Sequence, residues 1–178
     1  MNITGGIYKG RKIAAPDEKI VRPTLSKARE SIFNVLFSLL GDFNDKSFLD
    51  MFAGSGIMGL EALSRGFKAA YACEKNIKVA KIIKDNYVSL GISPNLIIGD
   101  SLKNLKKLLE KFAVIYLDPP YFSGIYEDSL KAIKEAELLN ENGIVILEHV
   151  QNVDWESLGY NLIKQKTYSN KFITFLSD

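Results

Sequence analysis

A chain of 178 residues with a net charge of +2 fits one ordinary globular domain, long enough to bury a sizeable core. Its single cysteine, Cys73, excludes an internal disulfide framework and a multi-cysteine metal site. No run approaches the roughly 18 apolar residues of a membrane span, and the N-terminus lacks the layout of a signal peptide. We therefore expect a cytoplasmic protein, with Cys73 as a buried strand residue.

Positive charge gathers at the N-terminus. Residues 1–30 carry seven basic and three acidic side chains, whereas residues 31–178 carry 16 basic and 18 acidic ones. Glycines and prolines in residues 1–23 predict a short irregular hairpin. A basic arm on a mildly acidic body favours contact with a polyanion through the N-terminus. A solvated tail is the alternative.

Apolar periodicity then predicts a helix from about residue 25 to 40, with Ala28, Ile32 and Leu39 on its buried face and Arg29 toward its polar edge. Apolar runs and helical patterns alternate after it. We expect strands at 48–52, 69–73, 95–99, 112–117 and 143–148, and helices at 57–65, 76–90, 101–111 and 126–138. Two β-rich runs, 160–168 and 171–176, predict an antiparallel hairpin at the sheet edge.

This order predicts an α/β fold, a doubly wound sheet that is mostly parallel and ends in an antiparallel hairpin. We expect a single domain over residues 1–178, with a basic N-terminal arm at 1–23 and a Rossmann-like core at 24–178.

A glycine turn follows the first strand. Ala53-Gly54-Ser55-Gly56 lies where an open α/β sheet binds a ligand, at the carboxyl end of a strand. The turn also satisfies G-x-G-x-x-G, so a dinucleotide site is allowed. Asp50, however, would repel a pyrophosphate at the helix N-terminus and would suit an ammonium or sulfonium group. S-adenosylmethionine carries both groups. The alternative is a tight strand–helix turn that binds no ligand.

Four predicted strands end in an acid: Asp50, Glu74, Asp100 and Asp118. In a parallel sheet these ends share one rim, where four carboxylates repel each other unless a cationic or hydroxyl-bearing ligand is bound. We expect Asp50 at the methionine end of the donor, Glu74 on the ribose hydroxyls and Asp100 at the adenine amine. Any one acid is more often a helix cap, and Asp100 before Ser101 is a good candidate for that role. The predicted donor-binding residues are Asp50, Phe52, Ala53, Gly54, Ser55, Gly56, Glu74, Asp100, Ser101 and Asp118.

The fourth strand leads into Asp118-Pro119-Pro120-Tyr121. The prolines fix the backbone and remove N–H donors, so their carbonyls act as acceptors. Asp118 and a proline carbonyl can accept both N–H bonds of a planar aromatic amine, while Tyr121 stacks on its ring. Catalysis would then depend on positioning and electrostatics. We predict these four residues as catalytic; a rigid turn is the alternative.

These motifs together resemble the amino-nitrogen methyltransferases that use S-adenosylmethionine. The N-terminus narrows the likeness, because Gly5-Gly6, Lys9-Gly10-Arg11-Lys12, Arg22-Pro23-Thr24 and Arg29-Glu30-x-x-Phe33-Asn34 resemble the RsmD family of 16S ribosomal RNA guanine-N2 methyltransferases. The resemblance implies a class I methyltransferase fold and S-adenosylmethionine as cofactor. It also implies a small-subunit rRNA guanine as target, within an assembled or partly assembled subunit.

On this hypothesis the guanine leaves its stack, its N2 attacks the methyl group in line, and water takes the surplus proton. Phosphate contacts are expected from Lys9, Arg11, Lys12, Arg22 and Arg29. No metal, membrane or obligate protein partner is expected. His149, which ends the fifth strand, is expected to be a structural residue, because the chemistry needs no imidazole; a catalytic base is the alternative.

Several alternatives stay open at this point. A DNA adenine-N6 or a protein glutamine-N5 methyltransferase could use the same amine chemistry. A nicotinamide-dependent oxidoreductase and a noncatalytic RNA-binding protein are further possibilities from other classes.

Overall fold

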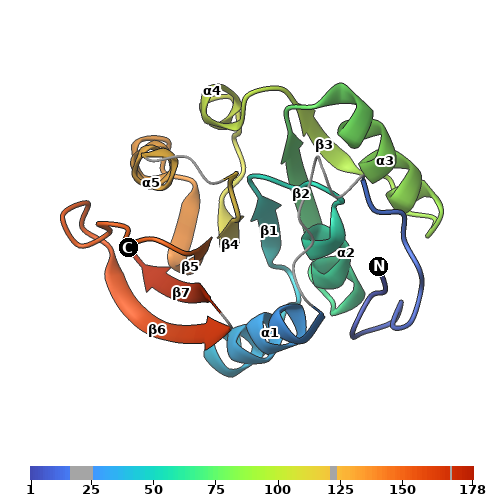
Figure 1. The fold of residues 1–178 in the computed structure, drawn as a ribbon, viewed down its shortest axis with the longest axis horizontal. Helices are drawn as coiled ribbons and strands as arrows, with labels where there is room; N and C mark the ends of the chain where they lie inside the picture. The colour runs from blue at the N-terminus through green and yellow to red at the C-terminus, as the bar shows by residue number, and fades with distance from the viewer. Residues whose placement is uncertain (17–25, 121–123, 169) are drawn as a thin grey trace.

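The computed structural model describes residues 1–16, 26–120, 124–168 and 170–178, and it forms one twisted seven-stranded sheet with helices on both faces (Figure 1). The helices are α1 (Ser26–Leu40), α2 (Ile57–Ser64), α3 (Ile77–Val88), α4 (Ser101–Leu105) and α5 (Ile125–Glu135). The strands are β1 (Ser47–Asp50), β2 (Ala69–Glu74), β3 (Asn95–Ile98), β4 (Phe112–Leu117), β5 (Leu139–His149), β6 (Asn161–Tyr168) and β7 (Lys171–Ser177). Among these described residues, no helix has the length and apolarity to span a bilayer.

The strand order is β3-β2-β1-β4-β5-β7-β6. Strands β1 to β5 pair in parallel, whereas β7 pairs antiparallel with both β5 and β6. This arrangement confirms the predicted sheet and its C-terminal hairpin. The chain order reverses between the neighbours β1 and β4, where Asp50 pairs with Tyr116. Open α/β sheets bind ligands at such a reversal point, outside the carboxyl ends of the strands.

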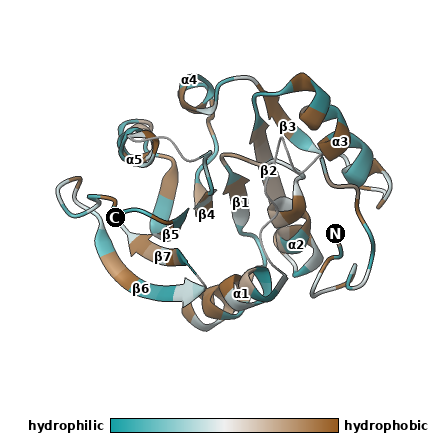
Figure 2. Cartoon of the chain, in the orientation of Figure 1, coloured by the Kyte–Doolittle hydropathy of each residue, from teal (hydrophilic) through white to brown (hydrophobic). Residues whose placement is uncertain are grey.

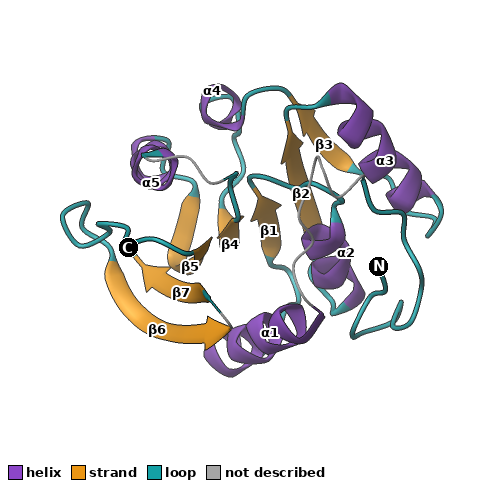
Figure 3. Ribbon diagram, in the orientation of Figure 1, coloured by secondary structure: helices purple, strands orange, loops and turns teal. Residues whose placement is uncertain are grey.

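Two apolar layers sandwich the sheet. Core residues of α1, α2 and α3 pack on one face, and those of α4 and α5 pack on the other. Figure 3 shows α1 and α2 on the side opposite α4 and α5. In Figure 2 the helices α1 and α3 carry alternating apolar and polar bands, as helices with one face on a sheet do.

Helix boundaries depart from the sequence prediction more than strand boundaries. The helix predicted at 101–111 ends at Leu105 as α4. Beyond it, the Glu110 carboxylate accepts hydrogen bonds from Ser47 and Tyr71, which draws the chain back to the start of β1 and β2. In α1, Leu39 is 41% exposed, and Phe33 instead completes the buried face, among Phe43, Phe48 and Phe67.

The first 13 residues fold into an irregular hairpin that packs on the body. Asn2 and Lys12 form an antiparallel bridge, and the Ile3 amide donates to the Arg11 carbonyl over 3.1 Å. The side chains of Ile3 and Ile13 are buried in the core layer of α1, α2 and α3. Figure 1 shows this segment running beside α2 and α3. The basic N-terminus is therefore docked, and the alternative of a free solvated tail is wrong for the described part of it.

The tip of the hairpin is bonded to the end of α2. The Ile7 amide donates to the Ser64 carbonyl over 2.8 Å, and the Ser64 hydroxyl donates to the Gly5 carbonyl over 2.5 Å. Gly6 has φ +77°, and a Cβ there would lie 1.7 Å from the Ser64 carbonyl oxygen. This close approach requires glycine at position 6.

Candidate functional site

Two carboxyl groups meet at the reversal point of the sheet. Asp50 ends β1 and is 1% exposed, and Asp118 directly follows the neighbouring strand β4. Burial raises the pKa of Asp50 to about 8, with smaller contributions from the charges of Asp118 and Glu74 and against the hydrogen bond that the Phe52 amide donates. A cation placed beside a buried carboxyl group stabilises its ionised form.

The glycine turn between β1 and α2 is tied to the end of β2. Glu74 accepts from the Gly54 amide over 3.1 Å and from the Asn76 amide over 2.7 Å. Gly56 has φ +77°, and a Cβ there would lie 3.0 Å from Ile83. Burial raises the pKa of Glu74, which lies half-buried at the turn. Each Glu74 oxygen retains acceptor capacity, because a carboxylate has about four lone-pair sites.

The other predicted donor residues lie along the same edge. Ala53 and Ser55 are buried and Phe52 is half-buried, and the Ala53 amide donates to the Cys73 carbonyl. Asp100 accepts a hydrogen bond from the Lys103 amide over 3.2 Å, so it caps α4, the alternative role that the sequence indicated for it. The structure thus brings Glu74 and Asp118 within electrostatic reach of Asp50, while Asp100 and the buried Ser101 follow the outer strand β3.

Asn86 on α3 is a contact of this turn that sequence reasoning missed. Its buried amide group donates to the Ser55 carbonyl over 3.1 Å and to the Ala14 carbonyl over 2.9 Å. Its oxygen accepts from the Ala14 amide over 2.8 Å. One side chain therefore links the glycine turn to the N-terminal segment. An asparagine between the buried Ile83 and Tyr87 of an apolar helix face was the available signal.

Asp118 has a charged neighbour that sequence reasoning also missed. The Lys171 ammonium lies 3.8 Å from Asp118 Oδ1 and donates to Glu148 Oε1. The Tyr116 hydroxyl donates to Glu148 Oε2 over 2.6 Å. Pro119 is buried and Pro120 is exposed. Tyr121, predicted to stack on the base, lies outside the described residues.

The predicted phosphate-binding residues divide into two groups. Lys9, Arg11 and Lys12 are exposed, as a polyanion contact requires. Arg29 is 1% exposed, so its prediction as a phosphate contact is wrong. Its guanidinium lies 3.3 Å from Glu61 Oε1 and donates to the Asn2 carbonyl over 2.8 Å. Arg22 lies outside the described residues.

Glu61 is the centre of a buried ion cluster. Besides Arg29, it accepts from Arg65 over 3.3 Å and from the Thr4 amide over 2.7 Å. A Cβ at Gly5 would lie 2.4 Å from the Arg65 guanidinium carbon. Gly5 and Arg29, two of the residues that carried the family resemblance, therefore serve to dock the N-terminal segment.

Neither the histidine nor the cysteine is placed for catalysis. His149 is buried, with Nε2 2.8 Å from Thr174 Oγ1 and Nδ1 2.6 Å from the Gln151 carbonyl oxygen, and burial lowers its pKa. Burial raises the pKa of Cys73 to about 12, so this thiol is neutral. Cys73 is buried, as expected, and the bond between His149 and Thr174 joins β5 to β7.

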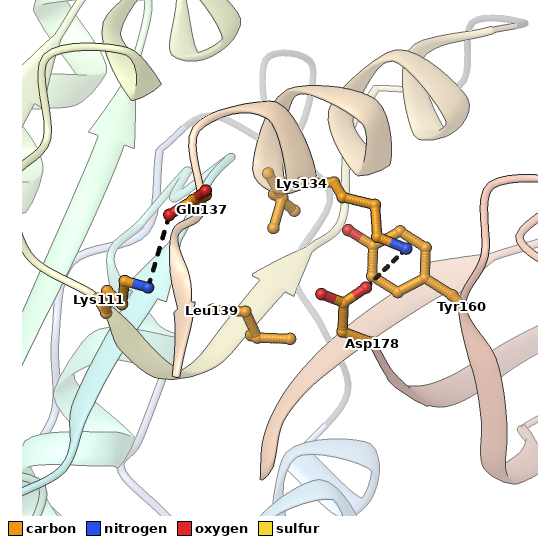
Figure 4. A pocket seen from close by; sticks show the side chains of 7 residues that line it. Lys111, Lys134, Glu137, Leu139, Tyr160 and Asp178 are labelled. Atoms are coloured by element: carbon orange, nitrogen blue, oxygen red, sulfur yellow. Dashed lines mark ion pairs between the residues drawn. The ribbon is translucent and has the colours of Figure 1, made fainter. Parts of the chain in front are cut away.

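A separate hollow of about 360 Å³ lies at the opposite ends of the strands, beside the start of β5 (Figure 4). Its charged groups pair with each other, Lys111 with Glu137 at 4.0 Å and Lys134 with Asp178 at 2.6 Å. It holds none of the predicted site residues.

Known proteins resemble this chain over most of its length. Residues 1–177 match the protein family described as conserved hypothetical protein 95. Ribosomal RNA small subunit methyltransferase D of Haemophilus influenzae is 31% identical over 173 residues, which cover 94% of this chain and 88% of that protein. The protein of the same name from Escherichia coli K12 is 30% identical over 149 residues, covering 83% of this chain and 74% of its own length.

A solved Escherichia coli structure, yhhF, provisionally named a methyltransferase, superposes with a TM-score of 0.85 at 25% identity. The match covers 99% of this chain and 96% of that one. This likeness confirms the expected methyltransferase fold. The chain therefore belongs to the RsmD family, as its motifs indicated.

Proposed function

We propose that this protein transfers a methyl group from S-adenosylmethionine to the exocyclic N2 of a guanine in small-subunit ribosomal RNA. The observation that carries the proposal is the meeting of Asp50 and Asp118 on adjacent strands at the reversal point of the sheet. One carboxyl is buried and suited to a cation. The other is partly open to solvent and begins a Pro-Pro turn, so it is suited to a neutral amine.

The residues present fit the cofactor. Gly54 and Gly56, with φ of 53° and 77°, give the turn between β1 and α2 its left-handed backbone, at the strand end where open α/β sheets bind ligands. Asp50 is a buried carboxyl whose ionised form needs a positive partner, and Glu74 offers acceptor sites for hydroxyl groups. When bound, S-adenosylmethionine would supply an electrophilic methyl group. Asp50 would hold its charged end, Glu74 its ribose and Asp100 its adenine amine.

On the acceptor side, Asp118 and the Pro119 carbonyl would accept the two N–H bonds of the guanine amine. Accepting both hydrogens holds this weak nucleophile in place and turns its nitrogen lone pair toward the methyl group. Pro119 has no amide hydrogen, so it cannot compete as a donor. The surplus proton would pass to water, and Tyr121 would stack on the unstacked base.

The exposed Lys9, Arg11 and Lys12 would bind RNA phosphates from a docked surface. Replacing all three by Gln should weaken RNA binding and reduce the slope of log affinity against log salt by roughly two to three. Donor affinity should be unchanged in that variant, because these side chains are exposed on the N-terminal hairpin. An unaltered salt slope would exclude this surface as the phosphate contact.

The decisive experiment offers tritiated S-adenosylmethionine with free rRNA, with 30S particles and with DNA, followed by nucleoside analysis. The proposal expects N2-methylguanosine from rRNA or 30S particles, and none with Asp118→Ala, which should still bind the donor. Label in DNA adenine, or in a protein glutamine of the particles, would identify one of the alternative methyltransferases. RNA binding without any transfer, or binding of NAD in place of the donor, would contradict the proposal.

A further inference from the structure

Asp118 is contacted by Lys171, the first of three linked side chains that come from three different strands. Lys171 opens β7, Glu148 lies near the end of β5, and Tyr116 lies in β4 two residues before Asp118. The Lys171 ammonium lies between two carboxylates, 3.8 Å from Asp118 and in contact with Glu148. The Lys171 and Asp118 side chains are 14% and 18% exposed, whereas that of Glu148 is 3% exposed.

The Glu148 end of this group of side chains is more deeply buried than the Asp118 end. Glu148 is held at both carboxylate oxygens, because Tyr116 donates to one and Lys171 donates to the other. A lysine side chain is flexible and carries three N–H donors. A deeply buried carboxylate restricts the position of its ammonium group more than an exposed carboxylate would. Asp118, at the open end of the group, is the carboxylate on which a confined Lys171 can act.

We propose that Lys171, anchored by Glu148, is a positioning residue that holds the Asp118 carboxylate in the orientation in which it accepts the amine to be methylated. The inference rests on the proposed function, because it assigns Asp118 to the acceptor amine. Lys171 does not touch the reacting atoms in this account. It acts through Asp118.

A cation beside Asp118 favours the ionised form of its carboxyl group. Asp118 lies within electrostatic reach of Asp50 on β1, and the Lys171 ammonium on β7 lies between Asp118 and Glu148 on β5. Glu148 shares the Lys171 ammonium with Asp118, and a neighbouring carboxylate disfavours the ionised form of a carboxyl. A protonated Asp118 would donate a hydrogen where the amine needs an acceptor. Lys171 opposes that protonation.

A purely structural role is the rival explanation, since Lys171 also neutralises the buried Glu148. Removing Lys171 alone would take the ammonium group away from the buried Glu148 carboxylate and could unfold the protein. The test therefore uses Glu148→Gln as its reference background, in which no buried carboxylate needs Lys171. Lys171→Met is then added to that background, because Met has similar length and no charge.

Methyl transfer is measured for the wild type, Glu148→Gln, and the double variant Glu148→Gln/Lys171→Met. Relative to Glu148→Gln, the double variant should lose roughly 100-fold in kcat, the cost of a displaced catalytic group, with little change in the KM for S-adenosylmethionine. Adding Lys171→Arg instead should restore part of the rate, because the charge is kept. Equal kcat values for Glu148→Gln and the double variant, both folded, would overturn the proposal.

A second measurement does not depend on activity. The carboxyl carbon of Asp118, assigned in a 13C spectrum by its loss in Asp118→Asn, is titrated in the same two variants. Loss of Lys171 should move its titration midpoint upward by about one pH unit or more, and an unmoved midpoint would overturn the proposal. If the wild type itself methylates no RNA, the proposed function fails, and this titration still decides whether Lys171 acts on Asp118.

Discussion

The buried cluster around Glu61 yields the sharpest stability prediction. Glu61 is fully buried and accepts from Arg29, Arg65 and the Thr4 amide, so it joins α1, α2 and the N-terminal segment. Glu61→Gln keeps the shape of the side chain, and it removes the negative charge that lies 3.3 Å from both the Arg29 and the Arg65 guanidinium groups. Removing one partner of a buried ion pair costs about 3–5 kcal/mol. For a domain of this size that corresponds to a fall in Tm of roughly 6–20 °C.

Urea unfolding followed by circular dichroism measures this loss, and thermal unfolding checks it. Glu137→Gln is the matched control, because the Glu137 side chain is 83% exposed and lies 4.0 Å from Lys111. That change should alter the free energy of unfolding by no more than about 0.5 kcal/mol. A loss below about 1 kcal/mol for Glu61→Gln would refute the interpretation that this cluster docks the N-terminus.

Three further predictions concern the glycine turn and its surroundings. Asp50→Asn should flatten a decline in stability of the ligand-free protein between about pH 4 and 8, because the folded state retains a proton there that the unfolded state has lost; the slope removed is up to about 1.4 kcal/mol per pH unit. Asn86→Ala should lower the free energy of unfolding by about 2–3 kcal/mol and weaken donor binding, because the Ser55 carbonyl loses its partner. Gly59→Ala should destabilise, since a Cβ there would lie 2.2 Å from the Tyr87 hydroxyl, and Tyr87→Phe should relieve that clash.

Each of these predictions has a clear contrary result. Chemical unfolding at several pH values would show an unchanged slope for Asp50→Asn if its carboxyl is already ionised. Isothermal calorimetry would show wild-type donor affinity for Asn86→Ala if the turn does not depend on that side chain. A double-mutant cycle on Gly59 and Tyr87 would give additive free energies if the two positions do not interact.

The sheet was predictable because its central strands are buried on both faces. Such strands are continuous apolar runs, and Phe112–Leu117 was predicted with its observed bounds. Helix ends depend on contacts far along the chain, so they were predicted less well. The early end of α4 follows from bonds between Glu110 and the distant Ser47 and Tyr71, which no local pattern reveals.

The acids and glycines of the site were predictable from their place at strand ends, but their supporting residues were not. Glu148 and Lys171 meet Asp118 only through the register of β4, β5 and β7. A charged residue at the end of the apolar run Ile144–Leu147 was an overlooked signal for Glu148. The prediction for Arg29 was wrong because the residue lies on the buried face of α1, one turn before the buried Phe33. Its partner Glu61 is 32 positions away, so no local pattern reveals the pair.

The central claim is that the carboxyl ends of β1 and β4 bring a cationic methyl donor and a neutral amine together. A crystal structure of the protein with S-adenosylmethionine tests this most directly. The account predicts the charged end of the donor beside Asp50, its ribose on Glu74 and its methyl group facing Asp118. A donor bound elsewhere, or an Asp118 side chain turned away from that methyl group, would contradict the account.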